Sequence, residues 1–263
     1  MDEICGKVQS VTKAMKLIDC LAKAKHALTL QELSQQAGYP KSTAHALLST
    51  LRDCSFVEQW DDGKYRLGIR LFELGMVVSG SWDILPLARN YIQSIAAETG
   101  EPVQLTTLDK NEVLVLDTQN PNTAFRVVLS TGSRLPCHCT ASGKAMLAFL
   151  PQAKTKSILR TIEIFAFTPH TMTESEQLEA ELADVRRSGF AIENGEYRIG
   201  LRAVAAPIFD VTGTPKYAIS VYGMYRGING EDFLLAQRLV QSTASAISKE
   251  LGYRGRNSEK AES

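Results

Sequence analysis

The chain has 263 residues, and its 29 basic side chains balance its 29 acidic ones, so the net charge at neutral pH is zero. This balance excludes a protein that binds a polyanion or a membrane surface through its overall charge. No apolar run approaches the roughly 18 residues of a membrane-spanning helix, and the first residues lack the apolar core of a signal peptide. We therefore expect a cytoplasmic protein of about two domains with no membrane partner.

The first part of the chain has the pattern of a helix-turn-helix. Apolar side chains at helical spacing indicate a first helix, and they are Val11, Ala14, Met15, Ile18, Leu21 and Ala22. Thr29 and Glu32 form a capping-box pattern that opens a second helix, and Gly38 suits the left-handed residue that closes one. Pro40 can begin a third helix but cannot continue the second.

The third helix has an apolar face and a small, polar face. Its predicted buried residues are Ala44, Leu47, Leu48 and Leu51. The opposite face holds Ser42, His45, Ala46 and Ser49. Small polar side chains suit a helix that enters the major groove of DNA, where they can reach the edges of the bases.

Residues 57–67 predict two short strands around an Asp-Gly turn, which would be the hairpin of a winged helix-turn-helix. Residues 1–82 contain ten Lys and Arg against nine Asp and Glu, a net charge of only +1. DNA affinity would then depend on Lys41 at the start of the third helix and on Lys64 and Arg66 of the hairpin. The alternative is a three-helix bundle used for protein contacts, in which these cations are solvated surface residues.

Past the hairpin, residues 69–78 predict a linker helix, and the Ser-Gly-Ser sequence at 79–81 marks its end. Several of its apolar residues would be exposed in a monomer, which suits a dimer contact.

The rest of the chain alternates helices and strands. Helices are expected at residues 86–99, 140–150 and 231–251, and another opens at a capping-box pattern, Thr173 to Glu176. The first of these buries Leu87, Tyr91 and Ile95, and the helix after Glu176 buries Leu178, Leu182 and Val185. Strands are expected at 103–108, 113–118, 125–130, 203–210 and 217–222. This pattern predicts an α+β fold in which helices cover a mainly antiparallel sheet, with a frayed end after Tyr253.

The five cysteines have no framework spacing and fit a reducing compartment; they are Cys5, Cys20, Cys54, Cys137 and Cys139. Cys20 and Cys54 are expected to be small packing residues. Cys137 and Cys139 flank His138, which raises metal binding or redox sensing as alternatives. No second cluster of Cys and His completes a tetrahedral site, so we predict neither a metal nor another cofactor.

Four stretches of this chain resemble, in order and at the expected spacing, those of the IclR family of bacterial transcription regulators. They are residues 8–14 in the first helix, 40–45 at the start of the recognition helix, 132–145 in the effector-domain loop and helix, and 200–210 in a late pocket strand. The resemblance runs from about residue 8 to residue 251. It implies a winged helix-turn-helix DNA-binding domain (1–68), a linker helix (69–82), a GAF-like effector-binding domain (83–253) and a disordered tail (254–263).

The resemblance also implies a function. Members of this family are typically dimers or tetramers that bind palindromic operators in double-stranded DNA, and many repress catabolic operons while some activate. Their effectors are often small organic acids, sugar acids or aromatics. We therefore expect a homo-oligomeric repressor of a catabolic operon whose operator binding is controlled by a small organic-acid or sugar-acid effector.

The family's effector pocket can be placed on this sequence. Thr140, Ala141 and Ser142 fall where the family offers backbone N–H groups to an acid at the start of a helix, and such a helix end attracts a carboxylate. Glu193 falls where related members use an Asp to hold a ligand hydroxyl, and Ser220 retains a pocket hydroxyl. The alternatives are that the side chains of Thr140 and Ser142 only cap the helix and that Glu193 is a surface carboxylate.

Three positions depart from the family pattern. Ala203 replaces a Cys that is often found in the pocket, and Tyr222 stands where glyoxylate-type members have Ser. We therefore do not expect glyoxylate or pyruvate to be the effector of this protein. We expect a hydroxylated acid, such as a sugar acid, whose hydroxyls are recognised by Glu193 and Tyr222. In the recognition helix, Ala46 stands where many relatives have Arg, the commonest guanine reader. Base readout is then expected from Ser42, Thr43, His45 and Ser49.

Two other classes of function fit parts of the sequence. An enzyme could use Ser142 with Lys144, or Glu193 with Glu196, as its reacting groups. The Ser–Lys spacing is two instead of the three of the Ser-x-x-Lys motif, and no phosphate loop or zinc motif is present, so we expect no catalytic residue. A regulator that needs no ligand would be favoured if its own side chains plugged the pocket, with Tyr222 as the candidate plug.

Overall fold

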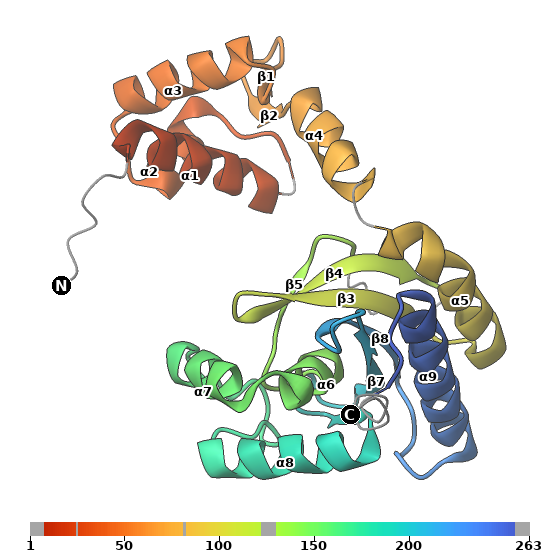
Figure 1. Ribbon diagram of the computed structural model, residues 1–263. Coiled ribbons are helices and arrows are strands. Elements are labelled where there is room, and N and C mark those ends of the chain that lie inside the picture. The colour runs from red at the N-terminus through yellow and green to blue at the C-terminus, as the bar shows by residue number, and fades with distance from the viewer. Residues whose placement is uncertain (1–7, 25, 81–82, 122–129, 256–263) are drawn as a thin grey trace. The chain divides into compact units, whose positions relative to one another are not determined.

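The computed structural model describes residues 8–24, 26–80, 83–121 and 130–255 (Figure 1). The chain divides into two compact units, Met1–Asp83 and Ile84–Ser263. The elements of the first unit are α1 (Gln9–Lys23), α2 (Leu30–Ala37), α3 (Lys41–Asp53), β1 (Val57–Gln59), β2 (Tyr65–Leu67) and α4 (Ile69–Gly80).

The first unit is a three-helix bundle with a two-stranded wing. The predicted capping box is present at the start of α2, where the Thr29 N–H donates to the Glu32 carboxylate at 2.7 Å. Gly38 closes α2 with a φ of 72°, as predicted, and α3 follows directly after Pro40. Helices α1, α2 and α3 contact one another around a core that also takes in Val57 of the wing. The unit therefore has the winged helix-turn-helix arrangement that the sequence predicts.

The predicted apolar face of α1 is partly wrong. Leu17 and Leu21 are its buried residues, whereas Val11 and Met15 are 58% and 46% exposed and Ala22 is also exposed. The apolar side chains of α1 extend around the helix beyond the side that meets α2 and α3. Spacing alone does not tell which side of such a helix enters the core.

Helix α4 forms as predicted and buries none of its residues within the described chain. It continues through Ser79 and Gly80, where the sequence predicted a break; Ser81 lies outside the described residues. No single helix in the described ranges is long and apolar enough to cross a membrane. Helices α4 and α5 match a span only when taken as a pair, and α5 buries five of its residues in the second unit.

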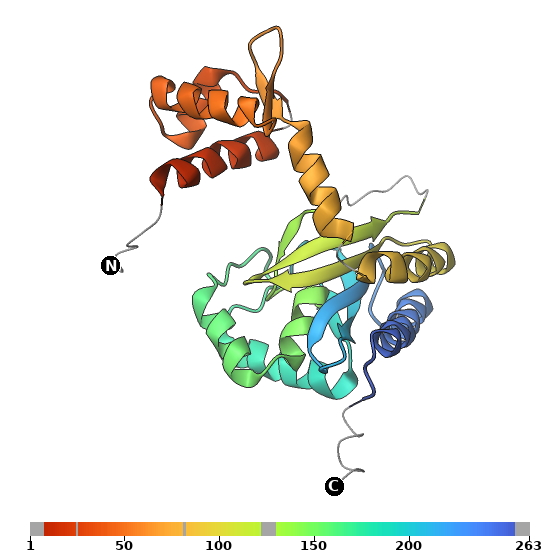
Figure 2. The same ribbon diagram turned by 45° about the horizontal axis from the view of Figure 1, so that its top comes forward.

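The second unit is built on a six-stranded sheet with the strand order β5-β4-β3-β8-β7-β6, in which every described pairing is antiparallel. Helices α5 and α9 lie side by side on one face of the sheet, and α6, α7 and α8 lie on the other (Figures 1 and 2). The strands are β3 (Val103–Asp109), β4 (Glu112–Gln119), β5 (Arg134–Pro136), β6 (Ala191–Asn194), β7 (Arg202–Phe209) and β8 (Pro215–Gly223). The helices are α5 (Ile84–Thr99), α6 (Ala141–Phe149), α7 (Gln152–Thr161), α8 (Ser175–Ser188) and α9 (Glu231–Glu250).

This architecture confirms the predicted α+β fold, with differences in detail. The capping box at Thr173 is wrong, because α8 begins at Ser175 after Glu174, which makes no side-chain cap. The sequence missed β5, β6 and α7, and the strand expected at 125–130 lies almost wholly outside the described residues. Leu87 and Tyr91 of α5 are half-buried, because the helix turns another side to the core, with Ile84, Ala88, Ile92, Ile95 and Ala96.

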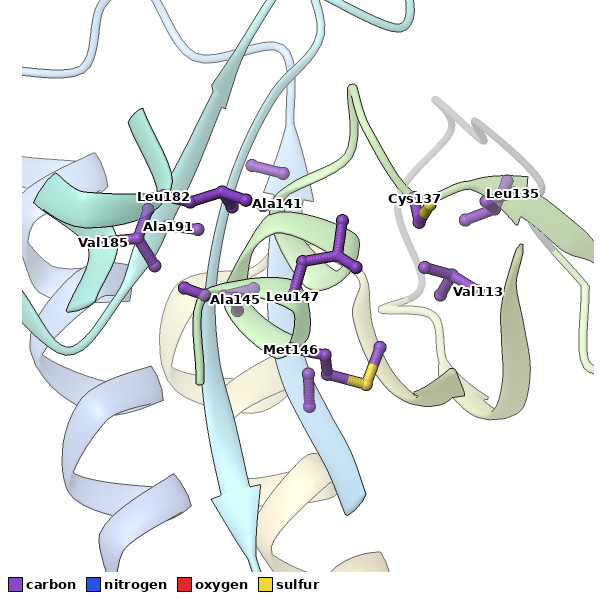
Figure 3. Packing of buried hydrophobic residues seen from close by; sticks show 14 of the residues in the cluster. Val113, Leu135, Cys137, Ala141, Ala145, Met146, Leu147, Leu182, Val185 and Ala191 are labelled. Carbon is purple, nitrogen blue, oxygen red and sulfur yellow. The ribbon is translucent and has the colours of Figure 1, made fainter. Parts of the chain in front are cut away.

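Helix α6 is the centre of the larger core (Figure 3). Its side chains lie between Leu182 and Val185 of α8 and the segment around Cys137 (Figure 3). Eight of its nine residues are buried, including Lys144. A β-carbon at Gly143 would lie 2.2 Å from the carbonyl oxygen of Cys137, so the backbone of α6 touches this segment. That close approach fixes where the N-terminus of α6 meets the sheet.

Candidate recognition helix and effector cavity

The predicted DNA contacts of α3 lie on the side of the helix away from the core. Ser42, His45 and Ala46 are exposed, and Thr43 and Ser49 are half-exposed. The residues that α3 buries are Ala44, Leu48 and Leu51. Leu47, predicted to be buried, is half-buried. The helix thus presents small side chains of the kind that can approach base edges closely.

Two of the predicted phosphate-binding cations have neighbours on their own unit. The Lys41 Nζ donates to the Gln31 Oε1 at 3.3 Å, and the Lys64 Nζ lies 2.9 Å from the Asp62 carboxylate. The Asp62 carboxylate raises the pKa of Lys64, so this side chain stays charged. Exposed pairs of this kind are worth about 1 kcal/mol or less, so a phosphate can replace the partner at little cost.

Arg66 on the wing is held on two sides. Its guanidinium donates to Glu58 on the paired strand at 2.5 Å and lies over the Trp60 ring, 4.8 Å from its centroid. These contacts orient the guanidinium at the edge of the hairpin. The half-exposed Trp60 extends the same surface.

All seven predicted effector-binding residues line one cavity in the second unit; they are Thr140, Ala141, Ser142, Glu193, Ala203, Ser220 and Tyr222. Each of them is buried. Four further residues complete the lining, and they are Gln104, Leu135, Tyr197 and Leu201. The cavity is about 30 Å³ in volume, room for about one or two water molecules.

Strand register explains why residues far apart in the sequence meet in this cavity. Glu193 of β6 pairs with Ala203 of β7, and Ala203 pairs with Tyr222 of β8, so the three lie in one row across neighbouring strands. Ser220 lies two residues from Tyr222 on the same face and pairs with Gln104 of β3. Directly opposed residues share one face of a sheet. The sheet therefore supplies one wall of the cavity.

The N-terminus of α6 supplies the opposite wall. The Thr140 Oγ1 accepts the Gly143 N–H at 3.3 Å and donates to the Pro136 carbonyl at 2.7 Å, so this hydroxyl caps the helix and is engaged twice. The Thr140 side chain thus caps the helix and also lines the cavity. A carboxylate at this end would be met by backbone N–H groups of the first turn, which have no partner within a helix.

Glu193 is a cavity residue and not a surface carboxylate. It is 2% exposed, and its Oε1 accepts the Tyr197 N–H at 3.1 Å. The pKa of Glu193 is raised to about 7, mainly by burial and also by the charge of Glu196, whereas the Tyr197 N–H and the charge of Lys144 act to lower it. The side chain is therefore poised to exchange a proton near neutral pH.

A buried charge cluster lies behind the cavity. The Lys144 Nζ lies 2.6 Å from the Glu196 Oε1 and 3.0 Å from the Glu181 Oε1. Lys144 is fully buried, and burial raises the pKa of Glu196. Because this ammonium is bound between two carboxylates, it is not placed to act as a base for Ser142.

The segment from Cys137 to Cys139 is buried. Burial raises the pKa of Cys137 to about 12 and that of Cys139 as well, which disfavours the thiolate forms that bind metals or react. Within the described residues, no group of three or more His, Cys, Asp or Glu could hold a metal ion. Of the two cysteines expected to pack, Cys20 is half-buried, whereas Cys54 is exposed at the C-cap position directly after α3.

Sequence reasoning missed Gln104 and Tyr197. Gln104 is a polar residue between the apolar Val103 and Leu105, and it is 2% exposed, so its polarity was the available signal. Tyr197 follows β6 in an irregular segment, where no periodicity marks the side that faces the cavity. Leu135 and Leu201 gave no signal beyond being apolar.

Comparison with known proteins agrees with this organisation. The family model for the IclR helix-turn-helix domain matches residues 10–61, and that for the bacterial transcriptional regulator IclR C-terminal domain matches residues 76–249. The chain is similar to the HTH-type transcriptional regulator XynR of Escherichia coli, with 31% identity over 247 residues that cover 94% of this chain and 98% of XynR. It is also similar to the transcriptional repressor IclR of Escherichia coli, with 33% identity over 221 residues that cover 83% and 81% of the two chains.

Among solved structures, the crystal structure of the Thermotoga maritima IclR has 30% identity and a TM-score of 0.78, covering 94% of this chain and all of that one. The match thus extends over both units, each of which also matches its own family model. The relatives named here are regulators of transcription and not enzymes. The chain belongs to the IclR family of DNA-binding transcriptional regulators.

Proposed function

We propose that this protein represses a catabolic operon and that a small organic-acid or sugar-acid effector in the second unit controls its binding to operator DNA. Residues 1–68 read the DNA, 69–82 link the domains, 83–253 bind the effector and 254–263 are a tail. The observation that carries the proposal is the gathering of seven residues, from one helix end and three strands, around one cavity at the N-terminus of α6. The protein would act in the cytoplasm as a homo-oligomer.

The chemistry of the cavity supports an acidic, hydroxylated effector. The first turn of α6 favours a carboxylate, and Glu193 and Tyr222 on the sheet wall can each exchange a hydrogen bond with a hydroxyl. Ser220 adds a third polar group on the same wall. Ala203 leaves the middle of the wall apolar and small.

DNA binding is tested by fluorescence anisotropy of the full-length protein on DNA from upstream of its own gene, against a scrambled duplex at several salt concentrations. We expect a specificity ratio of about 10³ or more. Equal and weak binding to both duplexes, followed by no enrichment from random DNA, would contradict sequence-specific recognition.

Effector control is tested by adding organic acids and sugar acids to the protein–DNA complex and by calorimetry on the free protein. We expect one acid of the panel to release the DNA and to bind the free protein. The matched variant Ser220→Ala should weaken the binding of that acid to the protein without changing the affinity for DNA. Release by no acid in the panel would count against effector control.

A second candidate, a regulator that needs no ligand, is favoured by one observation. The cavity of about 30 Å³ is far below the roughly 300 Å³ of the smallest typical ligand pockets, and Tyr222 is among the side chains that fill it. Such a protein would bind its operator with the same affinity in the presence of every acid tested. Its DNA binding would instead follow the concentration of a partner or of the protein itself.

A further inference from the structure

The inner cavity cannot receive an effector as it stands, so an effector requires a side chain of the wall to move. With about 30 Å³, the cavity has less than a tenth of the volume of a typical ligand site. The sheet wall is an unsuitable moving part. Tyr222 is 3% exposed and lies in β8, and its backbone is paired with β7 and with the Pro102 carbonyl.

A second, larger pocket of about 450 Å³ lies next to the inner cavity in the same unit. Its apolar lining comes mainly from Pro136, Ile162, Phe165, Phe167 and Tyr197. The ring of Phe167 lies 5.6 Å from that of Phe165 and 5.3 Å from that of Tyr197. The pocket is therefore a hollow with an aromatic side, large enough for a small molecule.

Tyr197 is the residue that lines both the inner cavity and this outer pocket. Its side chain is half-buried and follows β6 in a segment bounded by Gly195 and Gly200, whose φ values are 76° and 83°. Its backbone N–H is fixed on Glu193, so the ring can turn while the main chain stays in place. Among the described lining residues, Tyr197 is thus the best placed to open one space into the other.

The loop that carries the two phenylalanines is fixed to the same segment. The Thr168 Oγ1 donates to the Gly195 carbonyl at 2.7 Å, and the Thr171 Oγ1 donates to the Glu196 carbonyl at 2.6 Å. These bonds hold the aromatic side of the outer pocket against the residues around Tyr197. The outer pocket can therefore keep its shape when the ring turns.

We propose that the effector site consists of the inner cavity and the outer pocket, with the Tyr197 ring as the gate between them. The ligand of this site is an acid with a polar head and an uncharged, apolar body. This inference rests on the proposed function. The carboxylate and a neighbouring hydroxyl enter the inner cavity, at the N-terminus of α6 and beside Glu193. The body lies in the outer pocket against Phe165 and Phe167.

The charges of the outer pocket exclude a second acidic group on the ligand. Glu112 and Glu163 both line it, and its cation, Arg134, is already paired with Asp109 at 2.5 Å and with Glu112 at 3.3 Å. A carboxylate there would meet net negative charge. Within the acids of the proposed function, the aromatic side of this pocket favours an apolar chain over a row of hydroxyls, since aromatic rings offer hydroxyls no hydrogen-bond partners.

The role of the Tyr197 ring as a gate is tested by thiol labelling, which requires neither DNA nor an effector. Ala203→Cys places a thiol in the inner cavity of the full-length protein, and its modification by sodium 2-sulfonatoethyl methanethiosulfonate is followed by peptide mass spectrometry. We expect Tyr197→Ala to speed labelling of this thiol tenfold or more. Tyr197→Phe keeps the ring and should leave the rate unchanged, and native Cys20 serves as the reference thiol in every variant.

Phe167→Ala is the second variant, because it removes the edge-to-face partner of the Tyr197 ring while leaving the inner cavity intact. It should speed labelling severalfold. Equal labelling rates in the parent, Tyr197→Ala and Phe167→Ala proteins, with unchanged melting temperatures, would overturn the proposal that the Tyr197 ring is the gate.

The ligand class is tested by calorimetry with four six-carbon probes: 2-hydroxyhexanoate, gluconate, adipate and hexylamine. We expect 2-hydroxyhexanoate to bind at least tenfold more tightly than each of the others. Equal or tighter binding of gluconate or adipate, or binding of none, would overturn the proposed class. Because DNA binding is measured separately, these outcomes leave the test of the regulator itself independent.

Discussion

Glu193 is the residue at which burial and chemistry conflict most clearly. Its carboxylate lies in the cavity and accepts the Tyr197 N–H, and burial raises its pKa from 4.5 to about 7. Between these two values the folded protein holds a proton that the unfolded chain releases. The stability gained from the neutral form is therefore complete below about pH 4.5, falls as the pH rises and is lost above about pH 7.

Glu193→Gln should remove this dependence. From the two pKa values, we expect the wild-type contribution to fall by up to about 3 kcal/mol between pH 4.5 and 7, and the variant to lack this part of the slope. The measurement is urea unfolding at half-unit pH steps. Glu98→Gln, at an exposed residue, is the control, and its unfolding free energy should depend on pH as that of the wild type does. If the unfolding free energy of Glu193→Gln kept the slope of the wild type, the raised pKa of Glu193 would not be the cause.

Gly143 supports the site by its lack of a side chain. A β-carbon there would meet the Cys137 backbone at 2.2 Å, whereas one at Gly75 in α4 would meet nothing within 4 Å. We expect Gly143→Ala to destabilise the second unit by about 2 kcal/mol or more, because backbone has to shift. Gly75→Ala should instead stabilise its helix by about 0.5–1 kcal/mol. Thermal melts compare the two, and a neutral Gly143→Ala would contradict the close packing.

At the scale of elements, the sequence predicts best where local chemistry decides the structure. The capping box at Thr29 and the left-handed Gly38 depend on contacts within a few residues, and the buried stripe of α8 follows the helical period of its own sequence. The capping box at Thr173 does not form, and close to it the Thr171 hydroxyl bonds to the distant Glu196 carbonyl. Such a tertiary bond leaves no local pattern.

The missed elements and cavity residues have a similar cause. Strand β5 has three residues and is defined only by its pairing with β4. Gln104 enters the cavity through its register with Ser220, which lies more than a hundred positions away. The seven predicted cavity residues came from the family resemblance, since nothing in their spacing brings three strands and a helix end together.

The recognition helix allows a test at this scale. Ser42 and Thr43 lie at the exposed start of α3, and the helix is held by residues on its other side. Ser42→Ala and Thr43→Ala should each weaken operator binding by about 1 kcal/mol or more while leaving the melting temperature unchanged. Thr29→Ala is the matched control: it removes a cap, so it should lower stability by about 1 kcal/mol and keep the base preference.

Anisotropy on the operator and on single-base variants of it distinguishes these outcomes. A loss of preference at one base pair assigns the side chain to that pair, whereas a uniform loss assigns it to the phosphates. Operator binding that is normal in both variants would mean that another face of the first unit reads the DNA.

At the scale of the whole molecule, exposed apolar residues gather on helices of the first unit. In α4, Phe72 and Val77 are 66% and 72% exposed, and in α1, Val11 and Met15 are also exposed. The sequence predicts that apolar helix and strand residues form the cores of both units. It does not separate a core face from an exposed apolar face, and for this reason the predicted buried side of α1 was partly wrong. Exposed apolar helix residues of this kind are suited to a contact between copies.

Phe72→Glu with Val77→Glu should therefore shift the protein to a smaller assembly in sedimentation velocity. Val211→Glu, at a 71% exposed residue in a turn of the second unit, is the control and should leave the assembly unchanged. A monomer engages one half-site, so the slope of log affinity against log salt should fall to about half, because about half as many phosphates are neutralised. An unchanged assembly with an unchanged salt slope would show that α4 is not the contact and would direct attention to the exposed side of α1.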